Sequence, residues 1–121
     1  MNISTDQKVI NTIVEAIQDR KGKDTVVIDL TRLDVSNAQY FIVTQGNTPT
    51  QVAAIADSVR ETLLEQTGIK PVNYTGYSNA TWIVLDYGFI MVHIFVPETR
   101  NFYDIEQLWA DGDFTRIPDL D

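Results

Sequence analysis

The chain has 121 residues, which is the size of one domain and predicts a single hydrophobic core. It has no cysteine, which excludes disulfides, thiolate metal sites and cysteine nucleophiles, and its single histidine excludes a two-histidine metal site within one chain. Seventeen acidic and nine basic side chains give a net charge of −8. Phosphate backbones repel such a chain, so nucleic acid is a poor candidate for its main partner.

Charge and aromatic residues are concentrated toward the C-terminus. Residues 82–121 carry eight acids and two bases, and ten of the twelve aromatic residues lie from Tyr74 onward. Carboxylates interleaved with exposed aromatic rings are typical of a surface that docks on a basic protein. The alternative is that the rings form core and the acids only keep the chain soluble. Composition leaves both interpretations open.

The chain begins with a pattern typical of an amphipathic helix. Ser4 and Gln7 can form a capping box, and apolar residues at helical spacing continue to a stop signal at Gly22. Two strands are then predicted, at 25–30 and 40–44. The second is apolar almost throughout, which indicates a strand covered on both faces.

A second helix is predicted after a short turn. Thr48 is its expected N-cap, Pro49 occupies the first helical position, and Gly68 ends it. Residues 69–74 can form a strand, but Pro71 restricts that strand to a sheet edge or a strand start.

Residues 80–86 and 89–96 predict two strands joined by a tight turn at Tyr87-Gly88. One face of this hairpin is aliphatic and suits a core, whereas the other carries Trp82, Asp86 and His93. The predicted pairing places position 82 opposite 93, which leaves Asp86 about 13 Å from His93 and too far for a catalytic dyad. Only a different turn would bring these two side chains together.

The C-terminal part predicts a third helix over residues 98–110, with Phe102, Ile105, Leu108 and Trp109 on its apolar side. The acidic segment 111–121 contains glycine and proline and predicts a mobile tail after a single domain of residues 1–110. The order of elements predicts an α/β fold with a mixed sheet of about five strands packed with helices. With no export signal and no membrane-spanning apolar run, the sequence predicts a cytoplasmic protein.

No complete set of catalytic groups is visible in the sequence. The G-x-S-x-G, P-loop and G-x-G-x-x-G patterns are all missing. The turn at Gly46–Thr48 could hold a phosphate on backbone amides, or it could simply join a strand to a helix. A nucleotidyltransferase would also need two carboxylates one residue apart on a strand to hold magnesium, and here the candidate strands offer Asp86 alone. A nucleotide-handling enzyme is therefore the alternative to a binding protein.

Two segments carry a more specific pattern. The first comprises Tyr40-Phe41-Ile42-Val43, Gly46-Asn47, Gln51 and Ala54-Ile55-Ala56. The second comprises residues 82–88 (WIVLDYG) and 92–95 (VHIF), then Arg100, Tyr103, Glu106 and Leu108-Trp109. Over residues 5–110 the chain resembles the ribosomal silencing factor family, also called the Iojap family. It departs from the family pattern at Gln39 and Thr75, where the family usually has acids, so a role for those two acids is in doubt here.

The resemblance implies a nucleotidyltransferase-like fold without catalytic carboxylates, and a protein that is not an enzyme and needs no cofactor or metal. It implies binding to the large ribosomal subunit at its intersubunit face, chiefly to large-subunit ribosomal protein number fourteen. Contact with ribosomal RNA is expected to be minor. Occupying that surface would block the small subunit and repress translation. Organelle relatives act in ribosome assembly, which is a second alternative, and a homodimer of the free protein is compatible with the pattern.

The resemblance also transfers a contact surface onto this sequence. Trp82 is the expected aromatic anchor, Ile83 and Tyr87 are its apolar neighbours, and Asp86 is the expected partner of a basic side chain. A second group either joins this contact or holds the last helix on the sheet, and the sequence leaves both roles open: Arg100, Tyr103 and Glu106.

Overall fold

The computed structural model describes residues 5–33 and 38–120. The first half contains α1 (Thr5–Asp19), β1 (Lys23–Asp29), β2 (Tyr40–Gln45) and α2 (Pro49–Thr67). The second half contains β3 (Asn73–Thr75), β4 (Trp82–Asp86), β5 (Ile90–Phe95), α3 (Pro97–Tyr103), α4 (Ile105–Leu108) and β6 (Asp113–Arg116). The predicted cap at Ser4 lies outside the described residues.

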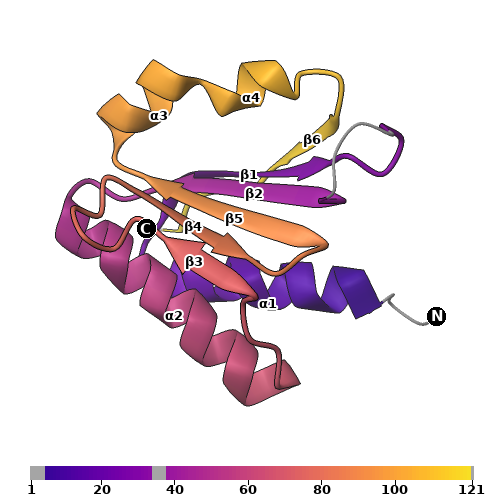
Figure 1. Cartoon of the computed structure of the whole chain (residues 1–121), viewed down its shortest axis with the longest axis horizontal. Coiled ribbons are helices and arrows are strands. Elements are labelled where there is room, and N and C mark those ends of the chain that lie inside the picture. Colours follow the sequence, from indigo (N-terminus) through magenta and orange to yellow (C-terminus); the bar gives the residue numbers. More distant parts are fainter. Residues whose placement is uncertain (1–4, 34–37, 121) are drawn as a thin grey trace.

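The strands form one mixed sheet with helices on both of its faces (Figure 1). Among the described residues the sheet has six strands in the order β3-β4-β5-β2-β1-β6. The β2–β5 pair is parallel and the other neighbouring pairs are antiparallel. The α/β class with a mixed sheet is therefore confirmed, with one strand more than expected.

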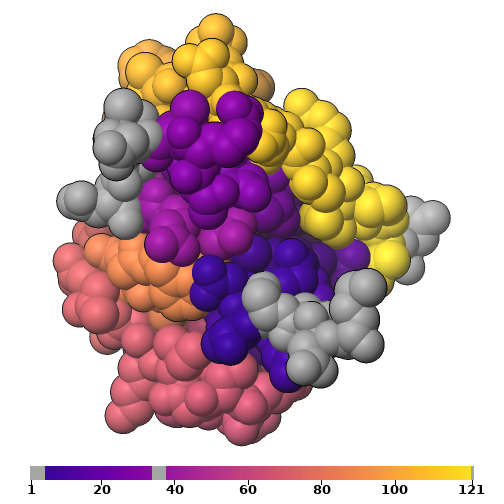
Figure 2. Space-filling view, turned by 90° about the vertical axis from the view of Figure 1, so that its right-hand side faces the viewer, coloured from indigo at the N-terminus to yellow at the C-terminus, as the bar shows by residue number. Residues whose placement is uncertain are grey.

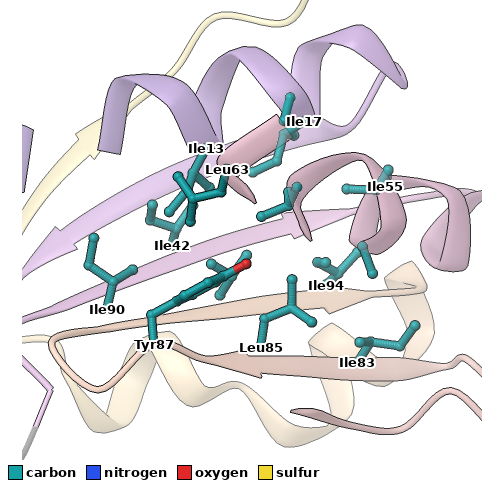
Figure 3. Close-up of a cluster of buried hydrophobic side chains, with 14 of the residues drawn as sticks. Ile13, Ile17, Ile42, Ile55, Leu63, Ile83, Leu85, Tyr87, Ile90 and Ile94 are labelled. Carbon is teal, nitrogen blue, oxygen red and sulfur yellow. The ribbon is translucent and has the colours of Figure 1, made fainter. Parts of the chain in front are cut away.

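One face of the sheet is closed by α1 and α2 and forms the larger core (Figures 1 and 3). Its side chains are almost all aliphatic, and burying each one stabilises the fold by about 1.5–3 kcal/mol. The fully buried members drawn in Figure 3 are Ile13, Ile17, Ile42, Ile55, Leu63, Ile83, Leu85, Ile90 and Ile94.

The ends of α2 follow the predicted chemistry. Thr48 Oγ1 accepts a hydrogen bond of 3.1 Å from the Gln51 N–H, and Pro49 occupies the first turn. At the other end Gly68 has a φ of 73°, in the left-handed region where glycine is favoured, and its N–H donates to the Leu64 carbonyl. These caps fix the length of the helix that covers the core.

On the opposite face of the sheet, the helices that the described residues provide are the short α3 and α4 (Figure 1). A second and smaller cluster lies beneath them, and it includes aromatic side chains. Its buried members are Val26, Ile28, Leu30, Ala38, Phe41, Val43, Phe95 and Ile105, and Trp82, Met91, Trp109 and Phe114 pack against them.

The turn between β4 and β5 lies one residue later than predicted. The structure pairs Trp82 with Phe95, so the predicted pairing of Trp82 with His93 is wrong. The loop consists of Gly88-Phe89, and Gly88 has a φ of 85° at the first loop position, which a type II′ turn reserves for glycine. The correction moves each partner by two residues, so every side chain keeps its predicted face.

The predicted helix over residues 98–110 is interrupted. Asp104 has a φ of 45° and separates α3 from α4, while its N–H donates to the Arg100 carbonyl at 2.9 Å. The break changes which side chains are buried. Ile105 remains in the smaller cluster, but Phe102 is 81% exposed and Leu108 is also exposed, contrary to the prediction.

The segment expected to be a mobile tail contributes a strand. Residues 113–116 form β6 against β1, and the Ile117 N–H donates to the Thr25 carbonyl at 2.9 Å. Gly112 allows the chain before β6 to approach β1 closely, because a Cβ atom at this position would lie 2.8 Å from Ile28 Cγ2. In Figure 2 the C-terminal residues (yellow) lie against the β1 region (purple). The sheet therefore extends beyond the boundary expected at residue 110.

Candidate docking face

An open patch lies where α3 and α4 leave β4 and β5 uncovered. Alternation along the strands directs Trp82, Val84, Asp86 and Met91 to this side, where all four are half-buried. Two side chains of α3 lie next to them: Phe102 is 81% exposed and Tyr103 is 51% exposed. We call this group the open face: Trp82, Val84, Asp86, Met91, Phe102 and Tyr103.

Trp82 is the structural centre of the open face. Its ring stacks on Phe95 with centroids 5.0 Å apart and contacts Tyr103 at 4.8 Å. Tyr103 in turn meets Phe102 edge-on at 5.0 Å. The indole Nε1–H donates a hydrogen bond of 3.2 Å to His93 Nδ1. The ring contacts run from the buried Phe95 to the exposed Phe102, so the open face is packed against the smaller cluster.

Asp86 and His93 do not form a dyad. The corrected register brings them closer than predicted, to a diagonal cross-strand relation of roughly 7 Å. Each is engaged elsewhere, however, since Asp86 Oδ1 accepts from the Gly88 N–H at 2.8 Å and His93 Nδ1 accepts from Trp82. Burial also lowers the pKa of His93 to about 4, so the ring is neutral near pH 7.

Ile83 and Tyr87 are not on the open face. Both point to the α1–α2 side, where Ile83 is 0% and Tyr87 6% exposed (Figure 3). Burial raises the pKa of Tyr87 to about 12. The prediction that these two side chains are the apolar neighbours of Trp82 on a partner surface is therefore wrong, because alternation along β4 and its continuation places them in the core.

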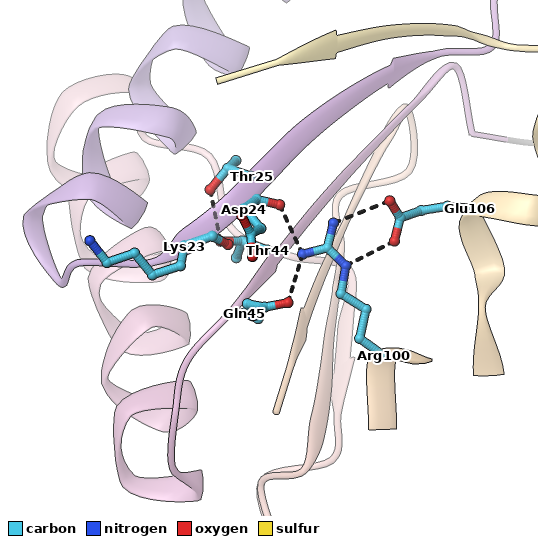
Figure 4. Close-up of polar contacts among 7 residues, drawn as sticks. All are labelled: Lys23, Asp24, Thr25, Thr44, Gln45, Arg100 and Glu106. Atoms are coloured by element: carbon cyan, nitrogen blue, oxygen red, sulfur yellow. Dashed lines mark hydrogen bonds and ion pairs between the residues drawn. The ribbon is translucent and has the colours of Figure 1, made fainter. Parts of the chain in front are cut away.

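Arg100 and Glu106 hold the last helices on the sheet (Figure 4). The buried Arg100 guanidinium donates to both Glu106 carboxylate oxygens, at 2.8 and 3.2 Å. It also donates to the Asp24 carbonyl at 2.8 Å and to Gln45 Oε1 at 3.1 Å, so it joins the helix break to the start of β1 and the end of β2. Of the three residues whose role was open, only Tyr103 is exposed.

The turn before α2 has few free amides for a phosphate. The Gly46 N–H donates to the Phe95 carbonyl at 2.9 Å, the Asn47 N–H donates to Gln51 Oε1 at 2.8 Å, and the Gln51 N–H donates to Thr48. Close packing favours the glycine, since a Cβ atom would lie 3.1 Å from the Val52 nitrogen. This geometry favours a strand-to-helix turn. Within residues 5–33 and 38–120, no three histidine or acidic side chains gather in a way that could hold a metal ion.

Comparisons with known proteins identify the family. The family model described as "Ribosomal silencing factor during starvation" matches residues 3–121. The chain belongs to this family. A ribosomal silencing factor of Chromobacterium violaceum is 37% identical over 104 residues, which cover 86% of this chain and 84% of that protein. One of Halalkalibacterium halodurans is 32% identical, covering 89% of this chain and 91% of the relative.

A solved structure supports the fold as well as the family. A crystal structure of a protein from Chromobacterium violaceum superposes with a TM-score of 0.81 at 36% identity, covering 91% of this chain and 88% of that one. The resemblance drawn from the two sequence segments is thus confirmed. In the part of this silencing factor that the structure describes, no helix has the length and apolar character needed to cross a membrane.

Proposed function

We propose that this silencing factor binds large-subunit ribosomal protein number fourteen through the open face and thereby occupies the intersubunit face of the large subunit. The bound factor excludes the small subunit by volume, so translation is repressed without a catalytic step. The protein acts in the cytoplasm, where the ribosomes are. The observation that carries this proposal is the exposed aromatic pair on α3 beside the half-buried Trp82.

The aromatic side chains of the open face suit a protein partner. Binding energy at protein interfaces is concentrated in tryptophan, tyrosine and arginine side chains near the centre of the contact. Here Trp82 and Tyr103 touch each other, and Phe102 extends the ring surface outward. Exposed rings of this kind are costly in water and gain free energy when a partner covers them.

The charge around the open face suits a basic partner. Asp86 lies on the open face itself, and the whole chain carries a net charge of −8. A carboxylate beside an aromatic centre, on an acidic protein, attracts a basic protein surface and speeds its encounter. The same charge repels ribosomal RNA phosphates, so docking on bare RNA is disfavoured and RNA contact stays minor.

Sedimentation with purified ribosomal particles tests the proposal. The parent protein is expected to co-sediment with isolated large subunits and to inhibit their joining with small subunits. Tyr103→Ala should weaken binding to large subunits about tenfold, which corresponds to about 1.4 kcal/mol. The matched control is Tyr74→Ala. Tyr74 is a similarly exposed tyrosine, but it lies on the α2 side of the sheet, where the Arg60 guanidinium stacks on its ring.

A charge reversal gives a second reading of the same contact. Asp86→Lys should weaken large-subunit binding about tenfold or more. Glu61→Lys makes the same change in net charge on the exposed side of α2 and should leave binding near the parent value. Equal binding by Asp86→Lys and the parent, or equal losses in the two lysine variants, would contradict docking through the open face.

A further inference from the structure

His93 lies beneath the open face, and among residues 5–33 and 38–120 its side chain has one hydrogen-bond partner. It sits on β5 opposite Val84 and is only 5% exposed. Its Nδ1 accepts the Trp82 indole N–H at 3.2 Å, which places the imidazole proton on Nε2. Within the described residues Nε2 has no hydrogen-bond partner. A buried N–H donor is therefore left unpaired.

Stability alone does not explain an imidazole at this position. Its ring lies among aromatic neighbours, with the centroid of Phe41 at 4.8 Å and that of Phe95 at 6.2 Å. An unpaired polar group in such surroundings loses its hydration without compensation, whereas an apolar side chain of similar volume leaves only the part-buried Trp82 indole N–H without its acceptor. A leucine here would be expected to stabilise the fold or leave its stability unchanged.

The hydrogen bond constrains the side chain that matters most on the open face. Trp82 is half-buried and packs against the smaller cluster. The orientation of the indole is set by its two side-chain torsions, and stacking on Phe95 restrains one face of the ring. The bond to His93 Nδ1 holds the Nε1 edge in place as well, and the contact with Tyr103 couples the indole to α3.

We propose that His93 is a positioning residue that fixes the Trp82 indole in the orientation in which the open face receives its partner. This inference rests on the proposed docking function. Binding a partner with an already ordered aromatic side chain avoids the entropy cost of ordering it on contact. The buried Nε2–H without a partner lowers the stability of the fold, and the ordered Trp82 side chain is what the protein gains from His93.

Three variants of the full chain separate positioning from a structural role. His93→Leu removes the acceptor and keeps the site apolar. His93→Asn retains an acceptor, because its Oδ1 can take the place of Nδ1. Trp82→Phe removes the donor and keeps an aromatic ring. Urea unfolding and affinity for isolated large ribosomal subunits are measured for each variant and for the double variant.

Positioning predicts that stability and affinity change in opposite directions. His93→Leu should unfold at the same or a higher urea concentration than the parent, yet bind large subunits about fivefold more weakly. His93→Asn should bind within about twofold of the parent even if it is less stable. In the Trp82→Phe background, His93→Leu should cause no further loss of affinity. Parent-like affinity of His93→Leu, or parallel losses of stability and affinity that asparagine does not rescue, would overturn the proposal.

A measurement without ribosomes keeps this proposal distinct from the docking function. Hydrogen exchange of the two indole N–H groups is followed by NMR, with Trp109→Phe used to assign the signals. His93→Leu should speed exchange of the Trp82 indole N–H about tenfold and leave Trp109 unchanged. Unchanged exchange at Trp82 overturns the positioning role, whereas parent-like binding by Trp82→Ala overturns the docking contact.

Discussion

The two faces of the sheet are built from the same strands but differ in what covers them. The α1–α2 face is aliphatic and lies under helices of 15 and 19 residues. The α3–α4 face is rich in aromatic side chains and lies under helices of 7 and 4 residues separated at Asp104. Two long helices cover most of one face, whereas two short ones leave β4 and β5 partly open on the other.

Neighbouring side chains along β4 point to opposite faces of the sheet. Ile83 lies in the closed core, while Trp82 and Val84 point to the open face. The core side supplies most of the buried aliphatic area and hence most of the stability. The open side keeps apolar rings at the surface, where they destabilise the free protein slightly but are available to a partner. Stability and docking can therefore be changed separately by mutations at adjacent positions.

The largest effect is expected for Ile83→Ala. Ile83 is fully buried between the sheet and α2, so its truncation leaves a cavity and should lower the free energy of unfolding by about 4 kcal/mol. Urea unfolding measures this loss. The folded fraction should still bind large ribosomal subunits with parent affinity, because the side chain faces away from the open face. A loss of affinity at unchanged stability would instead place Ile83 in the partner contact.

A smaller loss is expected for Arg100→Met, which removes the buried guanidinium below α3 and α4. Glu106 then loses its partner, and the acceptors on Asp24 and Gln45 are left unpaired. Breaking a buried pair of this kind should cost about 3 kcal/mol of stability. Affinity for the large subunit should fall as well, since Tyr103 is carried by the helix that Arg100 secures.

An ion pair at the surface provides the matched control for that prediction. Arg32 and Asp113 lie 2.9 Å apart, but their side chains are 62% and 58% exposed. Solvent screens such pairs, so Asp113→Asn should leave the urea midpoint unchanged within error. An equal loss in Arg100→Met and Asp113→Asn would show that burial of the Arg100 pair adds nothing.

The sequence predicted the elements of the α1–α2 face better than those that carry the open face. Apolar runs and helix caps were enough for α1, β1, β2 and α2, since each signal is local and strong. The prediction of which side chains lie on each face of the β4–β5 hairpin was also correct, although the turn was misplaced by one residue. A two-residue change of partner leaves every side chain on the same face.

The C-terminal part of the fold depends on contacts that no local sequence pattern reveals. The spacing of apolar residues 102, 105, 108 and 109 matches one continuous helix, and aspartate is an ordinary residue within a helix, so the break at Asp104 gave no signal. That break exposes Phe102, which the sequence placed on a buried side. Residues 113–116 are too short and polar to predict a strand, and they become one by pairing with β1.

The contact residues that the family resemblance implies do not all lie on one face of the sheet. Trp82, Asp86 and Tyr103 do lie together on the open face, but Ile83 is in the core. Alternation along the hairpin had already placed Ile83 on the aliphatic face, so this signal was available. The pairing of Arg100 with Glu106 was not, because the two are six residues apart and meet only across the helix break.

A further stability effect, smaller than those of Ile83→Ala and Arg100→Met, depends on pH and arises from His93 beneath the open face. Burial lowers the pKa of His93 to about 4, below the value of 6.5 expected for an unfolded chain. Above pH 6.5 the ring is neutral in both states, so its contribution to stability is constant. As the pH falls from 6.5 toward 4, the unfolded chain binds a proton that the folded protein does not, and stability decreases.

The expected decrease is about 2 kcal/mol between pH 7 and 5, since each pKa unit corresponds to about 1.4 kcal/mol. Urea unfolding at pH 7 and pH 5 measures it, and His93→Leu should lack this decrease. The assignment is unambiguous in this interval because the chain has one histidine and most carboxylates titrate at lower pH. Equal pH dependence in the parent and in His93→Leu would mean that the imidazole is not buried, and that the open face is less ordered than the closed one.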